Sequence, residues 1–282
     1  MSTKINFIPF IKRLSRSKTA FFGLIFLCFM LLVAIFAGVI APYAFSEQDL
    51  LNTLATPSME HPFGTDEFGR DVLSRIIYGS RISLLVGFIS VAIALVFGGF
   101  LGAVAGFFGG RTDHYIMRVM DVFLAIPQLL FAISVAATLG PGLGNLMLAV
   151  GVAAIPQYAR VVRAGVLSIR SLDYIEASTA SGGGKFYIIF KHILPNCAAP
   201  LIVQSTLGVA FAILVAAGLS FIGLGLEPPN PEWGAMLSTG REYIRDFPHL
   251  TIFPGLAIML TILSLNFLGD GLRDVLDPKL RR

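Results

Sequence analysis

The sequence predicts an all-α polytopic membrane protein with six transmembrane helices. Of its 282 residues, 55% are hydrophobic and only 13% are charged, whereas soluble domains carry about 25% charged residues. A helix needs about 20 consecutive apolar residues to cross a bilayer. Stretches of this kind lie near residues 20–41, 82–108, 116–139, 143–164, 196–225 and 250–270. The composition therefore excludes an ordinary soluble domain.

The distribution of positive charge predicts the orientation of these six spans. An even number of crossings puts both termini on the same side of the membrane. If that side is the cytoplasm, 16 of the 21 Lys and Arg residues are cytoplasmic and five are external. Cytoplasmic loops of membrane proteins carry an excess of Lys and Arg. We therefore expect a multi-pass protein whose N- and C-termini are both cytoplasmic.

The N-terminal third contains a basic segment, the first span and a long external loop. Residues 1–18 mix cationic with apolar side chains, which fits either a helix in the headgroup plane or a basic tail that sets the topology. The loop at 42–80 is rich in turn residues and in charges, without the spacing of a metal site. Cys28 in the first span and Cys197 near the fifth are expected to be buried free thiols, because neither belongs to a Cys-x-x-Cys motif.

Small residues recur every fourth position along the second predicted span. They are Ala94, Gly98, Gly102, Gly106 and Gly110. A row of this kind lets another helix backbone approach closely. We expect the row to pack against a helix of the same chain, with a second membrane subunit as the alternative partner.

Polar side chains within the spans are the candidates for a translocation pathway. Arg118 and Asp121 are one helical turn apart at the expected cytoplasmic edge of the third span, where they can form an ion pair. Uncharged polar groups lie deeper, and in apolar surroundings they need partners, water or substrate. The pathway candidates are Gln128, Gln204, Ser205, Thr206 and Asn266.

A polar island at 170–191 separates the fourth and fifth spans. Leu172 to Ser181 can form about three turns of helix, with two carboxylates near its positive N-terminal end. Gly182 and the two glycines after it then stop the helix. A second helix can begin after Lys185 and enter the membrane near Pro195. This pattern predicts a compact cytoplasmic segment that docks onto a partner protein.

The glycines of this island do not form a phosphate-binding loop. That motif requires a glycine five positions before the glycine of the Gly-Lys pair, with four residues between the two glycines, and a Ser or Thr after the lysine. Thr179 and Phe186 occupy these positions. The chain therefore does not bind ATP by this route.

The last external loop, residues 227–246, begins with a proline-rich turn. A short helix is expected to follow it. Its apolar side is expected to rest at the membrane interface. That side comprises Trp233, Met236, Leu237 and Tyr243.

Several of these motifs resemble those of ABC importer permeases. Glu176-Ala177-Ser178, Gly182 and Leu194-Pro195 are similar to the EAA signature of that family, which has alanine where this chain has Ser178 and isoleucine where it has His192. The stretch from His61 to Arg75 and the segment Leu219–Leu226 resemble the dipeptide, oligopeptide and nickel branch, and the chain is similar to its C-type subunit.

The resemblance implies the transmembrane domain of a type I ABC importer. Residues 1–80 would hold the N-terminal tail, first helix and first external loop, 81–272 the permease domain, and 273–282 a cytoplasmic tail. A coupling helix near 170–185 would contact the ATPase. The residues implied for this coupling are Glu176, Ala177, Ser178, Gly182, Leu194 and Pro195.

The resemblance also implies partners and a location. They are a second, B-type permease subunit, two cytoplasmic ABC ATPases that carry ATP and Mg, and an external substrate-binding protein, all at a bacterial inner membrane. This chain is expected to bind no cofactor, metal or nucleic acid and to be no enzyme itself, since it contains neither H-E-x-x-H nor G-x-S-x-G. Di- or oligopeptides are the expected substrate, with nickel or glutathione-like compounds as the alternative.

A secondary transporter is the less favoured class. Such a protein is expected to carry ionisable residues near the bilayer centre, or an inverted repeat with broken helices. The sequence indicates neither feature.

Overall fold

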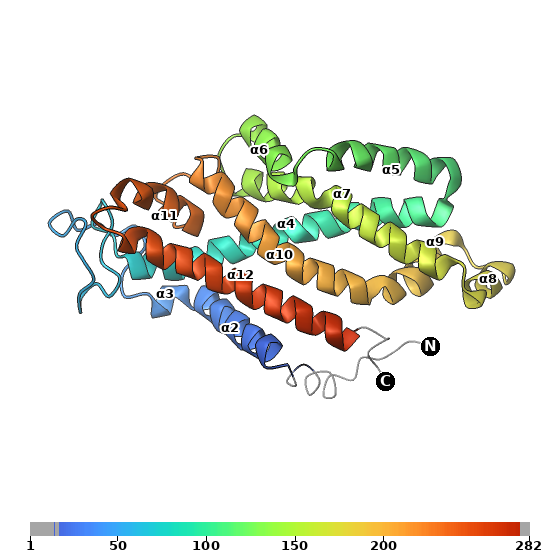
Figure 1. Cartoon of the computed structure of the whole chain (residues 1–282), viewed down its shortest axis with the longest axis horizontal. Helices are drawn as coiled ribbons and strands as arrows, with labels where there is room; N and C mark the ends of the chain where they lie inside the picture. Colours follow the sequence, from blue (N-terminus) through green and yellow to red (C-terminus); the bar gives the residue numbers. More distant parts are fainter. Residues whose placement is uncertain (1–13, 15–16, 277–282) are drawn as a thin grey trace.

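The computed structural model describes Leu14 and residues 17–276, and these residues are almost entirely helical (Figure 1). Five helical segments are long and apolar enough to cross a membrane, and counting a bent pair of helices as one span gives six. The segments are α2 (Lys18–Ile35), α4 (Val72–Phe108), α7 (Leu143–Arg170), Ile188–Phe221 with α10 (Ala198–Phe221) at its end, and α12 (His249–Leu276). The predicted all-α fold with six crossings is confirmed. The predicted basic segment 1–18 lies almost wholly outside the described residues.

The third predicted span, 116–139, is wrong as a single helix. It is divided into α5 (Gly110–Leu124) and α6 (Gln128–Leu139), whose axes differ by 88°. Pro127 follows the break, with φ −52° and ψ 130°. Proline lacks a backbone N–H, and it disfavours the helical conformation of the residue before it, here Ile126. The helix therefore ends before the proline and restarts in another direction.

Helices α4 and α7 pack closely along the row of small residues. A Cβ atom on Gly98 would lie 2.6 Å from the carbonyl oxygen of Ile155, and one on Gly106 would lie 2.8 Å from the Cβ of Val166. The predicted packing within this chain is therefore confirmed for these glycines. Gly110 takes no part, because a Cβ there meets nothing within 4 Å.

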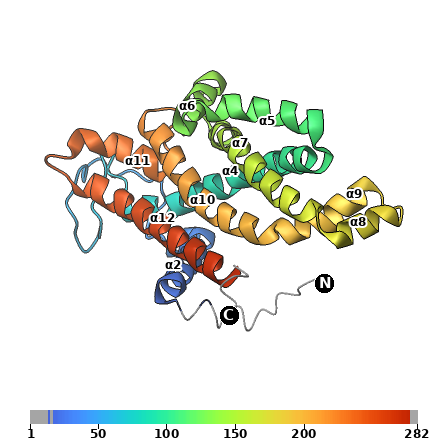
Figure 2. The ribbon, with the colours of Figure 1, turned by 45° about the vertical axis from the view of Figure 1, so that its right-hand side comes forward.

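Helix α2 lies along α12 on the opposite side of the molecule from α5 and α6, as both ribbon views show (Figure 2). A Cβ on Gly23 would lie 2.5 Å from the carbonyl oxygen of Ser264, so the two backbones approach closely. Cys28 is exposed on α2, whereas Cys197 is buried. The prediction of two buried thiols is wrong for Cys28, which faces outward from its helix.

The external loop is shorter than predicted because α4 begins at Val72 rather than after residue 80. Asp71 is the N-cap of α4, and its Oδ2 accepts a hydrogen bond of 2.7 Å from the amide of Ser74. Asp71 Oδ1 lies 3.0 Å from Nδ1 of His61. An N-cap carboxylate satisfies amides that have no partner within the helix. The predicted boundary between residues 80 and 81 therefore falls inside α4.

A buried ionic cluster holds the external loop together. Asp66 Oδ2 accepts from Nε of Arg70 at 2.6 Å and lies 3.4 Å from Nε of Arg75. Arg75 also donates 3.2 Å hydrogen bonds to the carbonyl oxygens of Phe45 and Pro229. Buried charges require paired and hydrogen-bonded surroundings. This cluster provides them, and it joins the loop at 41–71 to the connection before α11.

Helix α11 (Trp233–Gly240) is the predicted short external helix, but its apolar side does not rest at the membrane interface. Trp233 is fully buried against α4, where its Nε1 donates to the carbonyl oxygen of Ile76 at 3.1 Å. Gly79 makes room for the indole, since a Cβ there would lie 2.9 Å from it. Met236 is also buried, and Leu237 and Tyr243 pack against the core while partly exposed.

The N-terminus of α11 is capped by a buried carboxyl group. Glu232 accepts hydrogen bonds from the amides of Gly234 and Ala235 at 3.0 and 2.8 Å. Burial raises the pKa of the Glu232 carboxyl above its ordinary value of 4.5. We call the loop at 41–71 together with residues 227–247, both predicted from the sequence to be external, the external cap.

Candidate functional site

The polar island forms a projecting helix at the end of the molecule away from the external cap (Figures 1 and 2). This helix, α8 (Asp173–Ala180), has Asp173 and Glu176 in its first turn, where the helix dipole favours negative charge. Ile175 is its one buried residue. We call the segment from α8 to Gly184 the docking segment.

Ile175 anchors the docking segment in a small hydrophobic cluster. The side chain is 3% exposed. The cluster joins residues of α4, α7 and the start of the fifth span: Ala103, Val162, Val166, Ile169, Ile188, Ile189, Ile193 and Cys197. Ile175 therefore connects α8 to several of the long helices.

Two of the three glycines after α8 form a specific helix stop. Gly182 has φ +82°, and its amide donates to the carbonyl oxygen of Thr179 at 3.0 Å. The amide of Gly183 donates to the carbonyl oxygen of Ser178 at 3.0 Å, and a Cβ on Gly183 would lie 2.7 Å from that oxygen. This is the Schellman arrangement. A Cβ on Gly184 meets nothing within 4 Å.

The chain returns to the membrane through irregular helix. The short α9 (Lys185–Tyr187) is followed by a π-helical turn, η1 (Ile188–Ile193), and a 3₁₀ turn, η2 (Leu194–Cys197). Pro195 explains the irregularity, because it cannot donate to the preceding turn and its ring crowds that turn. Asn196 Nδ2 lies 3.3 Å from the hydroxyl of Tyr174 in α8. The predicted helix after Lys185 is thus present, in altered form, and contacts the docking segment.

The residues predicted to couple to an ATPase lie in two groups. Glu176, Ala177, Ser178 and Gly182 are on the projecting turn, where only Ser178 is partly buried. Leu194 and Pro195 lie at its base, and Leu194 lines the cavity described next. Their proposed contacts with a partner remain predictions.

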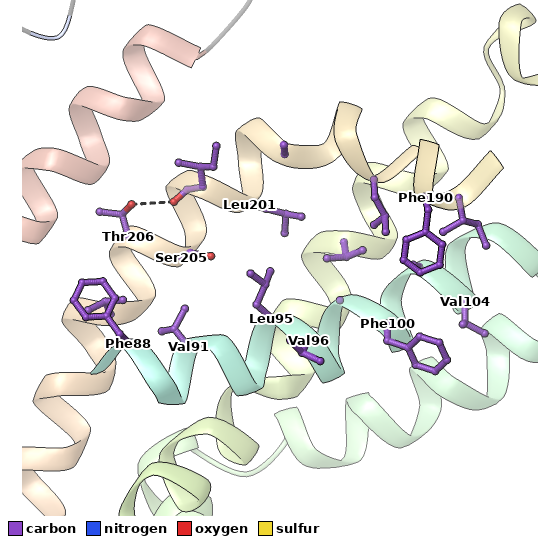
Figure 3. Close-up of a pocket in the computed structure, with 18 of the residues that line it drawn as sticks. Phe88, Val91, Leu95, Val96, Phe100, Val104, Phe190, Leu201, Ser205 and Thr206 are labelled. Atoms are coloured by element: carbon purple, nitrogen blue, oxygen red, sulfur yellow. Dashed lines mark hydrogen bonds between the residues drawn. The ribbon is translucent and has the colours of Figure 1, made fainter. Parts of the chain in front are cut away.

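An apolar cavity of about 990 Å³ lies between α4 and α10, with α2 and α12 contributing to its wall. Figure 3 shows Phe88 and Leu95 of α4 on the side that faces Leu201 and Ser205 of α10. Ser205 and Thr206 are the two pathway candidates in its lining. The hydroxyl group of Thr206 donates a hydrogen bond of 2.9 Å to the carbonyl oxygen of Ile202.

The other three pathway candidates lie elsewhere. Gln128 begins α6, Gln204 is in α10 and Asn266 is in α12, and all three are partly buried. Transfer of an unpaired polar or charged group into apolar surroundings is unfavourable. The cavity therefore offers little to a charged solute, and the structure does not bring the five candidates together.

Charged side chains instead gather between α5 and α7. Asp121 pairs with Arg160 at 2.7 Å, so the predicted Arg118–Asp121 pair is wrong. One turn along α7, Arg163 donates from Nε and Nη2 to the two carboxylate oxygens of Asp113, at 2.5 and 2.6 Å. A recess of about 350 Å³ lies beside these pairs, lined by Gly110, Asp113, His114, Met117, Arg118, Asp121 and Arg163.

Sequence reasoning missed these pairs because their members are 39 and 50 residues apart. The sequence offered one signal, the Arg160 and Arg163 charges inside or beside an apolar stretch. Within the described part of the chain, no three His, Cys, Asp or Glu side chains come together as metal ligands.

A six-crossing helical protein with a projecting docking segment is the architecture of a transporter's membrane subunit. The family model described as "binding-protein-dependent transport system inner membrane component" matches residues 98–282. A second, "N-terminal TM domain of oligopeptide transport permease C", matches residues 9–57. The chain belongs to this family of binding-protein-dependent permeases, and it is the permease subunit of an ABC importer. The resemblance drawn from the sequence is confirmed.

Curated relatives cover nearly the whole chain. The dipeptide transport system permease protein DppC of Alkalihalophilus pseudofirmus is 48% identical over 270 residues, which are 96% of this chain and 89% of the relative. The glutathione transport system permease protein GsiD of Pectobacterium atrosepticum is 42% identical over 283 residues, 99% of this chain and 93% of the relative.

A solved structure is similar in fold. A chain of the MetNI methionine ABC transporter, in an inward facing conformation, matches with a TM-score of 0.59 at 19% identity, covering 71% of this chain and 96% of that one. At this identity the likeness supports the fold alone. It agrees with the predicted ABC importer transmembrane domain.

Proposed function

We propose that this chain forms half of the translocation pathway of an ATP-driven importer of di- or oligopeptides. The relative from Alkalihalophilus pseudofirmus, 48% identical, is named for dipeptide transport. The other half of the pathway is a second, homologous permease subunit. An external substrate-binding protein delivers the peptide, and two ABC ATPases in the cytoplasm bind ATP and Mg and hydrolyse the nucleotide.

The observation that carries this proposal is the exposure of the docking segment. Seven of the eight residues of α8 lie at the surface, wholly or in part, while Ile175 alone is buried. A short helix with few contacts of its own is a marginal structure in water. Its geometry suits a surface that a partner completes, and Glu176, Ala177 and Ser178 lie on that surface.

The orientation of the chain follows from its charges. We infer that α8 and both termini are in the cytoplasm of a bacterium and that the external cap is outside the inner membrane. The permease domain, placed at 81–272 from the sequence, then includes the whole of α4 from Val72. Residues 273–282 form the cytoplasmic tail.

Coupling operates as a shift between two conformations. Closure of the ATPase dimer moves the docking segment, and the cluster around Ile175 passes this movement to α4, α7 and the fifth span. Converting a 1:99 mixture of inward-open and outward-open states to 99:1 takes about 5.5 kcal/mol of differential binding. The contacts of α8 with the ATPase must supply this difference.

The test is reconstitution of the complete importer in proteoliposomes. Glu176→Lys and Gly182→Pro are expected to abolish ATP-driven peptide uptake while the subunit still inserts and assembles. Asp274→Lys is the matched control, because Asp274 is also exposed but lies on α12. Normal uptake in both docking-segment variants would refute the coupling role.

The identity of the partners is tested first by gentle solubilisation of the tagged chain. Mass spectrometry is expected to identify a second permease and ABC ATPases in the purified complex. Recovery of the chain alone, still able to move solute without ATP, would refute the importer.

A glutathione importer is the second candidate, because GsiD of Pectobacterium atrosepticum is 42% identical. It is less supported than the dipeptide relative at 48%, and no relative named here supports nickel. The uptake of a labelled dipeptide is measured with an excess of unlabelled dipeptide, glutathione or nickel. The compound that competes with the label identifies the substrate class.

A further inference from the structure

The chain turns sharply where α4 is followed by α5. Helix α4 ends at Phe108, and Gly109, with φ +65°, is both the C-cap of α4 and the N-cap of α5. We call residues 106–112 the α4–α5 corner. It lies at the same end of the molecule as α8 and α9 (Figure 1). Both helices that meet at this corner contact α7, so the position of the corner determines how both lie on α7.

Arg170 contacts the corner from the N-terminal side of the docking segment. It is the last residue of α7, just before α8 begins at Asp173. Its Nη1 donates hydrogen bonds to the carbonyl oxygens of Gly106 and Phe107 at 3.2 and 3.1 Å. The last four carbonyls of a helix have no partner within it, and they form the negative end of its dipole. Arg170 therefore satisfies two groups that the end of α4 leaves free.

Lys185 contacts the same corner from the C-terminal side of the docking segment. It is the first residue of α9, directly after Gly184. Its Nζ lies 5.3 Å from the ring centroid of Phe108, the last residue of α4. This distance is within the range of a cation–π interaction. Each flank of the docking segment thus places a cation against the end of α4.

These contacts differ in kind from the apolar anchor at Ile175. Hydrophobic packing is non-directional, whereas a hydrogen bond depends on the direction between donor and acceptor. Arg170 and Lys185 are also exposed, whereas Ile175 is buried. Among the described residues, neither cation belongs to an ion pair. Substitution of exposed side chains changes stability little, so the two cations can be removed without unfolding the protein.

We propose that Arg170 and Lys185 are positioning residues of the importer, which hold the α4–α5 corner to the two flanks of the docking segment. A movement of α8 then reorients the end of α4 and the start of α5. Ile175 keeps α8 attached to the long helices, whereas the two cations fix the direction in which the corner follows. Neither cation touches the peptide. This inference rests on the proposed coupling to ATPases.

The first experiment measures peptide uptake per ATP hydrolysed by the complete importer in proteoliposomes. The double variant Arg170→Met/Lys185→Met removes both cations and keeps unbranched side chains. Its uptake per ATP is expected to fall about tenfold, which is within the usual range of coupling between two sites. The single variant Arg170→Lys keeps a charged donor and is expected to retain most of the uptake.

Lys191→Met is the matched control. Lys191 is also exposed, but its Nζ lies over the ring of Tyr187 in its own segment, 4.8 Å from the centroid. This variant should behave as wild type. Normal uptake in the double variant would overturn the inference. A lower unfolding temperature of the double variant, or loss of the ATPases from its purified complex, would show a structural role and would also overturn it. No ATP-driven uptake by the unsubstituted importer would instead refute the proposed function.

The second experiment follows the movement itself and needs no peptide. The importer carries Cys28→Ala, since the remaining Cys197 is buried, and its partner subunits are free of cysteine. A single cysteine replaces Ser181 in the docking segment or Thr112 in the corner, both exposed, and carries a fluorophore that responds to its surroundings. Addition of ATP is expected to change both signals.

In the Arg170→Met/Lys185→Met background, only the signal at position 181 should still change. A change at position 112 of normal size would overturn the inference, because the corner would then follow α8 without the cations. Loss of both signals would show that the cations act on ATPase docking rather than on the corner, and would overturn it as well.

Discussion

The external cap and the docking segment satisfy their polar groups in opposite ways. In the cap, Asp66, Arg70 and Arg75 are buried and pair with one another and with backbone carbonyls. In the docking segment, Glu176 and its neighbours are exposed. Because its buried charges are paired within the chain, the cap needs no partner to satisfy them. The docking segment is anchored at one residue, and its exposed surface suits completion by a partner.

The difference indicates where movement starts and where it is resisted. Segments with few buried contacts are drawn from the low-stability part of a protein, and moving elements come from that part. The cap is tied to α4 by Asp71 and Trp233. We therefore expect ATPase-driven movement to enter at α8 and to reach the cap through α4 as a rigid displacement.

The largest effect is expected from breaking the cap. Asp66→Ala leaves Arg70 and Arg75 buried without their carboxylate, and breaking a buried pair in this way costs about 3–5 kcal/mol. The purified importer in nanodiscs should lose thermal stability. Glu60→Gln, on the exposed part of the loop, is the control that should leave the unfolding temperature unchanged. Equal stability of both variants would mean that the cluster is not a support.

Removal of the anchor of the docking segment should have the next largest effect. Ile175→Ala creates a cavity in the cluster, for which about 2–5 kcal/mol is typical. The loss should be local, so ATPase stimulation and uptake fall while the unfolding temperature of the membrane domain changes little. Leu172→Ala, whose side chain is 44% exposed, should behave as wild type. A global loss of stability would show that the two regions are not separate.

Gly182 and Gly184 are expected to respond differently to substitution by alanine. Gly182→Ala forces an L-residue into φ +82° and should weaken coupling at a cost of about 1 kcal/mol. Gly184 has φ −64° and ψ 145°, which alanine adopts freely, so Gly184→Ala should be neutral or stabilise by about 0.4–1 kcal/mol. Uptake rates and protease sensitivity of the segment measure both. Identical behaviour of the two variants would contradict the Schellman assignment.

The smallest expected effect is a pH dependence of the cap. Because the pKa of Glu232 is raised in the folded protein, the folded state binds its proton more tightly than the unfolded state. This contribution to stability is present below pH 4.5 and is lost as the pH rises through the raised pKa. Glu232→Gln should remove it. Thermal unfolding of both proteins across this pH range is the measurement, and parallel curves would contradict the prediction.

The sequence predicted features that depend on local pattern. Apolar length predicted the crossings, the small-residue row predicted close packing of the second span against another helix of the chain, and Gly182 predicted the end of α8 close to where it lies. Each of these signals is carried by neighbouring residues.

The features that sequence reasoning missed depend on distant partners. Pro127 was read as part of a continuous span, although its lack of an N–H divides the helix. Trp233 was assigned to the membrane interface, but Gly79, remote in sequence, provides the space that buries it. Asp121 was paired with Arg118 on its own helix, whereas the fold offers Arg160 across 39 residues. The pattern of neighbouring residues in a sequence does not show which distant residues come into contact.

Helix α4 has 37 residues and is therefore about 55 Å long, nearly twice the thickness of the hydrocarbon core at about 30 Å. The Asp71 cap lies at one end of α4, and hydrogen bonds from Arg170 to the carbonyl oxygens of Gly106 and Phe107 lie at the other. We expect a helix of this length to tilt as one rigid unit. A tilt of about 10° around its middle moves each end by about 5 Å, the height of one helical turn, and in opposite directions. We therefore expect an opening on one face of the membrane to be accompanied by closure on the other.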